Sequence, residues 1–68
     1  MQDYLDEMER IREAVDGVEN PDWRAVLELR YLSFMTWDRI VEKLPFSRST
    51  VLDYHRRGLR EIGEKAIQ

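Results

Sequence analysis

The sequence of 68 residues contains no cysteine and only one histidine. Without cysteine the chain forms no disulfide and offers no thiolate to a metal ion. A single histidine does not build a zinc site without several partners. We therefore expect neither a metal nor any other cofactor. The absence of cysteine also fits a reducing compartment, and we expect a cytoplasmic protein.

Long apolar runs are missing as well. No run approaches the roughly 20 residues that cross a bilayer, so we expect no membrane partner. The N-terminal sequence MQDYLDEMER is acidic and lacks the apolar core of a signal peptide. No Ser, His and Asp set has a catalytic spacing, and no glycine-rich loop follows a strand. The acidic residues at positions 3, 6, 7 and 9 would splay around a helix and not form a metal-binding loop. We therefore expect a soluble protein that is not an enzyme.

Alternation of apolar and polar residues, the mark of a strand, is absent over any useful length. The apolar spacing is helical throughout, which predicts an all-α fold. A first helix is expected over about residues 2–16. Its apolar side chains repeat at the spacing of a coiled-coil seam: Tyr4, Met8, Ile11 and Val15. A helix this short is marginal in water by itself, so the seam must pack on residues 23–35, on another copy, or on both. We expect residues 1–19 to be an association element that makes a homodimer.

Three further helices are marked by residues that cap helix N-termini. The predicted caps are Asn20, Thr36 and Ser47. The helix that follows Asn20 has apolar residues on two sides and is expected to be buried on both. Pro45 should end the helix of about residues 37–44, because proline cannot continue the hydrogen-bond ladder.

Charge is divided unevenly along an acidic chain of formal net charge −3. Residues 1–22 hold eight acidic and two basic residues, whereas residues 23–68 hold nine basic and six acidic ones. Such a split indicates a polyanionic partner for the second part, although two solvated faces of opposite sign would give the same split. At about 100° per residue, the last helix separates two sets of side chains. The apolar side holds Val51, Tyr54, His55, Gly58, Leu59 and Ile62, and the other side holds Ser49, Asp53, Arg56, Arg57 and Arg60.

Two short helices joined by a tight turn, the second one exposed and basic, form the helix-turn-helix pattern. In this motif the first helix crosses the DNA backbone and the second enters the major groove. Arg48, in the first turn of the second helix, is expected to bond guanine. The candidates for backbone contacts are Thr36, Ser47, Thr50, Arg56, Arg57 and Arg60. For Asp53 we favour an i,i+4 ion pair with Arg57 over a contact to cytosine.

The same segment resembles region 4 of bacterial sigma factors, and within that group the phage-encoded RinA/ArpU-type transcriptional regulators. The resemblance covers about residues 24–63. It rests on LRY at Leu29–Tyr31, TWDRIVEKL at Thr36–Leu44, SRSTV at Ser47–Val51 and RRGLREI at Arg56–Ile62. Three residues depart from the family pattern: Val41 stands in place of Ala, Pro45 in place of a turn Gly, and Phe34 in place of a small or polar residue.

The resemblance implies that residues 20–68 are a helix-turn-helix domain that binds double-stranded DNA in transcription regulation. It also implies that the base-facing positions are Arg48, Ser49, Leu52 and Asp53. Sigma region 4 docks on RNA polymerase too, so a protein-interaction module for the polymerase is the alternative. A helical oligomerisation domain with an incidental basic face is a third reading. An exposed Phe34 would mark a partner surface.

Overall fold

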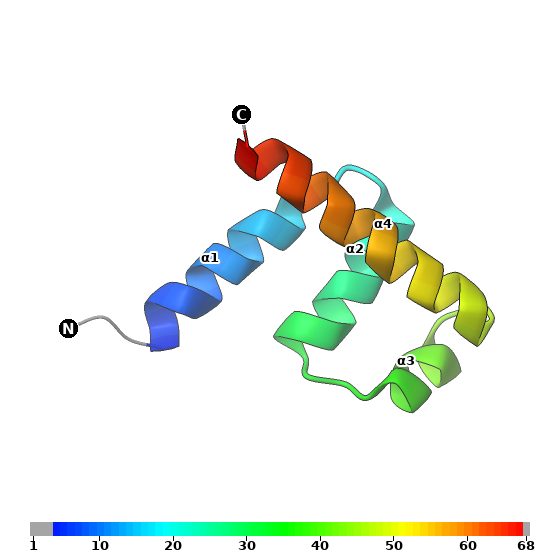
Figure 1. Cartoon of the computed structure of the whole chain (residues 1–68). Coiled ribbons are helices and arrows are strands. Elements are labelled where there is room, and N and C mark those ends of the chain that lie inside the picture. The colour runs from blue at the N-terminus through cyan, green and yellow to red at the C-terminus, as the bar shows by residue number, and fades with distance from the viewer. Residues whose placement is uncertain (1–3, 68) are drawn as a thin grey trace.

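The computed structural model describes the backbone of residues 4–67 and the side chains of residues 5–65. The described elements are, in order, α1 (Tyr4–Asp16), α2 (Pro21–Leu27), the π-helical turn η1 (Glu28–Leu32), α3 (Trp37–Lys43) and α4 (Arg48–Ile67). No strand occurs within residues 4–67, so the all-α prediction is confirmed. In Figure 1, α4 runs across α2 from α3 at its N-terminal end towards the C-terminal end of α1.

The three predicted caps are confirmed. Asn20 Oδ1 accepts the backbone N–H of Asp22 at 2.9 Å. Thr36 Oγ1 and Ser47 Oγ each accept the backbone N–H three residues further on, at 3.3 Å in both cases. A side-chain oxygen thus satisfies a donor that the first turn of each helix leaves without a partner. Pro45 ends α3 as expected, because the preceding Leu44 takes the extended backbone that a proline imposes.

The segment formed by α2 and η1 lies between two apolar clusters, which confirms its predicted burial on two sides. The first cluster joins it to α1 and the end of α4, with Val15, Val18 and Leu27 at its centre. The second cluster joins it to α3 and the start of α4, with Val26, Ile40 and Val51 at its centre. Two small clusters that share one helix replace a single large core, as a chain of this length requires.

The π-helical turn and its end were not predicted from the sequence. The N–H of Ser33 donates to Glu28 O and that of Met35 to Leu29 O, both at 3.0 Å. Between them Phe34 takes φ 58°, in the left-handed region that glycine normally occupies at a helix end. The side chain of Phe34 is 64% exposed. The backbone therefore carries strain at this residue without burial of the aromatic ring in compensation.

Gly58 allows α4 to cross α2 closely. A Cβ at this position would lie 2.7 Å from Leu27 Cδ1 and 3.2 Å from Leu27 Cγ. Leu27 is fully buried, so it has little room to move away. Gly63, one turn and a half further along α4, would meet nothing within 4 Å. The first of these glycines is therefore required by packing and the second is not.

The C-terminal part of α4 is joined to the loop between α1 and α2. The carboxylate of Glu61 accepts the backbone N–H of Glu19 at 3.0 Å and an ion pair from Lys65 at 3.1 Å. The backbone hydrogen bond, and then the lysine, lower the pKa of Glu61. Lys65 also donates to the carbonyl of Gly17. These contacts hold the end of α4 beside the end of α1.

One expected core residue is exposed. Leu59 was predicted on the inner side of α4, yet 41% of its surface is accessible. Its position on the helix is as expected, but it lines an open groove together with Ile11 and Ala14 of α1. Of the predicted association seam, Val15 is buried in the first cluster and Ile11 packs against it. The side chain of Tyr4 lies outside the described side chains. Within residues 4–67, no helix has the length and apolarity needed to cross a membrane.

Candidate nucleic-acid interface

The helices α3 and α4 form the helix-turn-helix unit, and the turn between them spans residues 44–47. The second apolar cluster fixes their relative position, since Ile40 and Val51 are both fully buried within it. Phe46 and Tyr54 add an edge-to-face ring contact, with centroids 5.2 Å apart at 76°. The N-terminal end of α4 is therefore held rigidly against α3, which is the geometry required of a helix that is presented to a groove.

Arg48 forms an ion pair with Asp38 in the structure without DNA. Asp38 lies in the first turn of α3 and Arg48 in the first turn of α4, and both side chains are exposed. An exposed pair of this kind is worth little and is readily exchanged for another partner. Arg48 thus lies at the predicted base-reading position, but it must leave Asp38, or share it, to contact a base.

The predicted pair between Asp53 and Arg57 is confirmed. Arg57 Nε donates to Asp53 Oδ2 at 2.7 Å, and Arg56 Nη2 lies 3.6 Å from Oδ1 of the same carboxylate. Arg56, Arg57 and also Arg60 are exposed on α4. The carboxylate of Asp53 therefore contacts two guanidinium groups that lie more than two turns beyond the start of α4, and both arginine side chains remain exposed.

Hydroxyl groups gather at the start of α4. Ser47 Oγ donates to Thr50 Oγ1 at 3.0 Å and lies 3.2 Å from Ser49 Oγ. Hydroxyls of this kind bond bases or phosphates. Leu52, one turn further on, is 39% exposed and offers an apolar contact. The predicted base-facing residues at the start of α4 are thus accessible or half-buried, and Thr36 is exposed at the start of α3.

An aromatic cluster behind this surface was not predicted as part of the site. Tyr31 from η1 and Trp37 from α3 both contact His55 on α4, with ring centroids 5.7 and 4.9 Å away. Arg30 stacks over Trp37 at 4.6 Å and donates to Met35 O at 2.9 Å. Burial, and then the charge of Arg30, lower the pKa of His55. The cluster locks three elements together; its signal in the sequence is the LRY motif followed by Trp37.

The chain belongs to the DUF1492 family. The family model, described as a protein of unknown function, matches residues 3–63. The DUF1492 match therefore includes α3 and the first sixteen residues of α4, with the aromatic cluster behind them. Neither a curated protein nor a solved structure matches the chain significantly.

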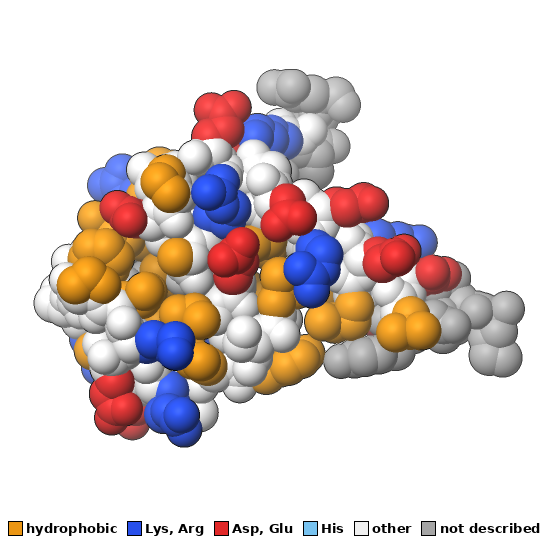
Figure 2. Space-filling model, turned by 180° about the vertical axis from the view of Figure 1, so that it is seen from behind, with side chains coloured by type: hydrophobic (Ala, Val, Ile, Leu, Met, Phe, Trp, Pro, Cys, Tyr) orange, Lys and Arg blue, Asp and Glu red, His pale blue; other side chains and the backbone are white. Residues whose placement is uncertain are grey.

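The surface at the start of α4 offers hydrogen-bond donors and positive charge. Within the described residues, His, Asp and Glu side chains form no group of three that could hold a metal ion. On the face seen in Figure 2, basic side chains are interspersed with acidic ones and do not form a continuous basic patch.

Proposed function

We propose that this protein is a sequence-specific, double-stranded DNA-binding transcription regulator of the sigma region 4-like type. The α3–α4 unit is its reading head. The first turn of α4, with Arg48 and Ser49, enters the major groove, and Leu52 and Asp53 lie at the base edges one turn later. The resemblance to RinA/ArpU-type regulators extends the proposal to the control of phage or prophage genes.

The observation that carries the proposal is the exposed start of α4. Ser47, Arg48 and Ser49 are all exposed at a capped helix N-terminus that is anchored on α3 by a buried cluster. Free N–H groups and the helix dipole favour phosphate at such an end. Arg56, Arg57 and Arg60 follow along α4, where phosphates come into reach as the groove curves away.

A second function is favoured by Phe34. Its aromatic ring is exposed on a strained backbone, which fits a protein-contact site. Docking on RNA polymerase, which sigma region 4 also performs, is therefore the alternative to DNA binding. The two functions are compatible.

Titration of labelled duplex DNA with the protein over a series of salt concentrations tests the proposal. Binding through phosphate contacts predicts that log affinity falls linearly with log salt concentration. An isolated small reader should bind weakly at physiological salt and clearly at low salt. If the protein does not bind duplex DNA even at low salt, the proposal is wrong. Capture of purified RNA polymerase by wild type, lost with Phe34→Ala, would then support the docking function.

A further inference from the structure

A groove lies between the C-terminal half of α1 and the second half of α4. The α1–α4 groove has a volume of about 290 Å³ and its walls are Ile11, Ala14 and Val15 on α1 and Leu59 and Ile62 on α4. Leu27 and Tyr31 form its floor. Every one of these side chains is apolar or aromatic. The groove is therefore a hydrophobic surface that the described part of the chain leaves open.

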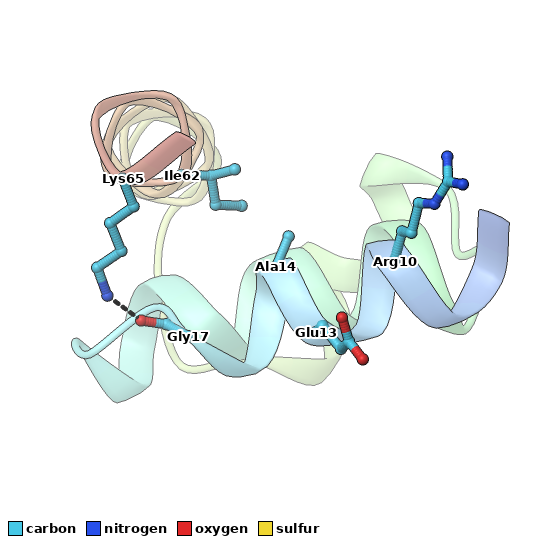
Figure 3. A pocket seen from close by; sticks show the side chains of 6 residues that line it. All are labelled: Arg10, Glu13, Ala14, Gly17, Ile62 and Lys65. Carbon is cyan, nitrogen blue, oxygen red and sulfur yellow. Dashed lines mark hydrogen bonds between the residues drawn. The ribbon is translucent and has the colours of Figure 1, made fainter. Parts of the chain in front are cut away.

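A second pocket shares Ala14 and Ile62 with the groove and is lined further by Arg10, Glu13, Gly17 and Lys65 (Figure 3). There Ala14 and Ile62 point towards each other across the gap, and Lys65 reaches the carbonyl of Gly17. This hydrogen bond joins the residue after α1 to α4. An apolar groove between two helices is the kind of site where a third helix packs in small helical bundles.

The chain itself carries a helix with the matching apolar stripe. The C-terminal half of α1 packs in the protein's own core, where Val15 is 2% exposed. Its N-terminal half does not: Leu5 is 69% exposed and Met8 is half-buried. The two halves of the predicted seam are thus in different surroundings. The C-terminal half packs on residues 23–35 of its own chain, as one of the alternatives predicted, and the N-terminal half exposes its apolar residues.

The charges of α1 and α4 also favour α1 as the helix that fills the groove. The α1 segment carries five acidic and two basic side chains, whereas α4 carries five basic and three acidic ones. At about 100° per residue, Arg56 lies on the outer edge of the stripe that contains Leu59. If Leu5 and Met8 of an acidic helix face the groove, Glu9 lies at the border of that apolar stripe and can reach the basic edge. Opposite charges along the rim fix the register of such an interface.

We propose that the α1–α4 groove receives the N-terminal half of α1 from a second copy of this chain. The proposed dimer is the closed form, two-fold symmetric, in which each copy's α1 enters the other copy's groove. Leu5 and Met8 of each copy pack against Leu59 and Ile11 of the other. The proposal concerns assembly without DNA and stands or falls independently of the proposed function. A dimer would also place two reading heads on one DNA, which raises avidity without any new base contact.

Sedimentation equilibrium without DNA tests the proposal with matched variants. Leu59→Lys places a charge in the groove, whereas Leu52→Lys makes the same change on the same helix at a residue of nearly equal exposure, 39% against 41%, outside it. We expect wild type to dimerise, Leu59→Lys to weaken the dimer by more than about tenfold, and Leu52→Lys to leave it unchanged. A wild type that stays monomeric at all concentrations overturns the proposal and leaves the groove to another partner. Equal weakening by both variants also overturns it.

Disulfide crosslinking gives a second test that does not depend on the folding of a lysine variant. The chain lacks cysteine, so introduced thiols are the only ones present. A Leu5→Cys protein is mixed with a Leu59→Cys protein of different mass, and air oxidation is followed. The mixed disulfide should form faster than that between Leu5→Cys and Leu52→Cys, because only the first pair is held together. Equal rates for the two mixtures would contradict the proposed contact. Far-UV circular dichroism confirms that each variant keeps its helices.

Discussion

Tyr31 Oη lies 2.7 Å from His55 Nε2, and this hydrogen bond joins the π-helical turn to α4. Trp37 from α3 approaches the same imidazole edge-on, with the two ring planes at 82°. His55 thus links η1 and α3 to its own helix, α4. Burial, and then the charge of Arg30, lower its pKa and so favour the neutral imidazole.

The first prediction concerns pH. The pKa of His55 lies below its ordinary value of 6.5 in the folded state, so the unfolded chain binds the proton more readily. The neutral imidazole of His55 therefore contributes fully to the free energy of unfolding above the pKa that it has in the unfolded chain. That contribution is lost as the pH falls below about 6.5 towards the lower pKa of the folded state. Urea denaturation of wild type should show a falling free energy of unfolding in this range, above the pH at which carboxylates titrate. His55→Gln should remove that dependence; an identical pH profile for the two proteins would contradict the assignment.

The second prediction compares two glycines of one helix. Gly58→Ala should destabilise the protein by about 1–3 kcal/mol, because the added methyl group collides with the buried Leu27. Gly63→Ala should instead stabilise it by about 0.5–1 kcal/mol, since alanine favours the helix and meets open space. Chemical denaturation measures both free energies of unfolding. Stabilisation by both substitutions would show that α4 and α2 are not in close contact at Gly58.

The third prediction addresses the strained backbone at Phe34. Phe34→Gly should raise the free energy of unfolding by about 1 kcal/mol, because glycine adopts φ 58° without a steric cost. Phe34→Ala is the control: it also removes the exposed ring but keeps a Cβ in the left-handed region. Thermal denaturation of the three proteins distinguishes the two effects. Equal stabilisation by glycine and alanine would assign the gain to loss of the ring and not to the backbone.

The sequence predicts well those features that depend on neighbouring residues. The caps at Asn20, Thr36 and Ser47, the stop at Pro45 and the Asp53–Arg57 pair follow from local chemistry, and all are present. The π-helical turn was missed because its apolar residues have nearly the same spacing as in an α-helix. The left-handed Phe34 was missed because phenylalanine carries no preference for that region.

The sequence pattern does not predict features that depend on the angles between helices. The helical spacing puts Leu59 on the inner side of α4, but whether another helix covers that side depends on the course of α1. The ion pair of Arg48 with Asp38 links residues ten positions apart and exists only because α3 and α4 meet at their N-terminal turns. The close approach at Gly58 likewise depends on where α2 crosses, and the sequence indicates only that the glycine faces inward.

The fourth prediction concerns Arg48 and its ion pair. Arg48→Ala should cost about 1–3 kcal/mol on a preferred duplex, selected from random DNA, and relax the preference at one base pair. Asp38→Asn should act in the opposite direction, because it frees Arg48 and removes a negative charge near the DNA. The gain should be modest, about 0.2–1 kcal/mol, as for exposed ion pairs. Titrations on preferred and scrambled duplexes decide this: equal losses on both for Arg48→Ala would mean that Arg48 only holds the backbone.

The central claim, that α4 binds DNA through its arginines, is tested most directly by the salt dependence of two matched variants. Arg57→Gln removes an exposed cation from α4, and Arg12→Gln removes one from α1, which is expected to face away from DNA. For each protein, affinity for duplex DNA is measured over a series of salt concentrations. Arg57→Gln should flatten the slope of log affinity against log salt by about 0.9, the value for one lost phosphate contact, and Arg12→Gln should leave the slope unchanged. A slope unchanged by Arg57→Gln, or flattened equally by both substitutions, would contradict the claim.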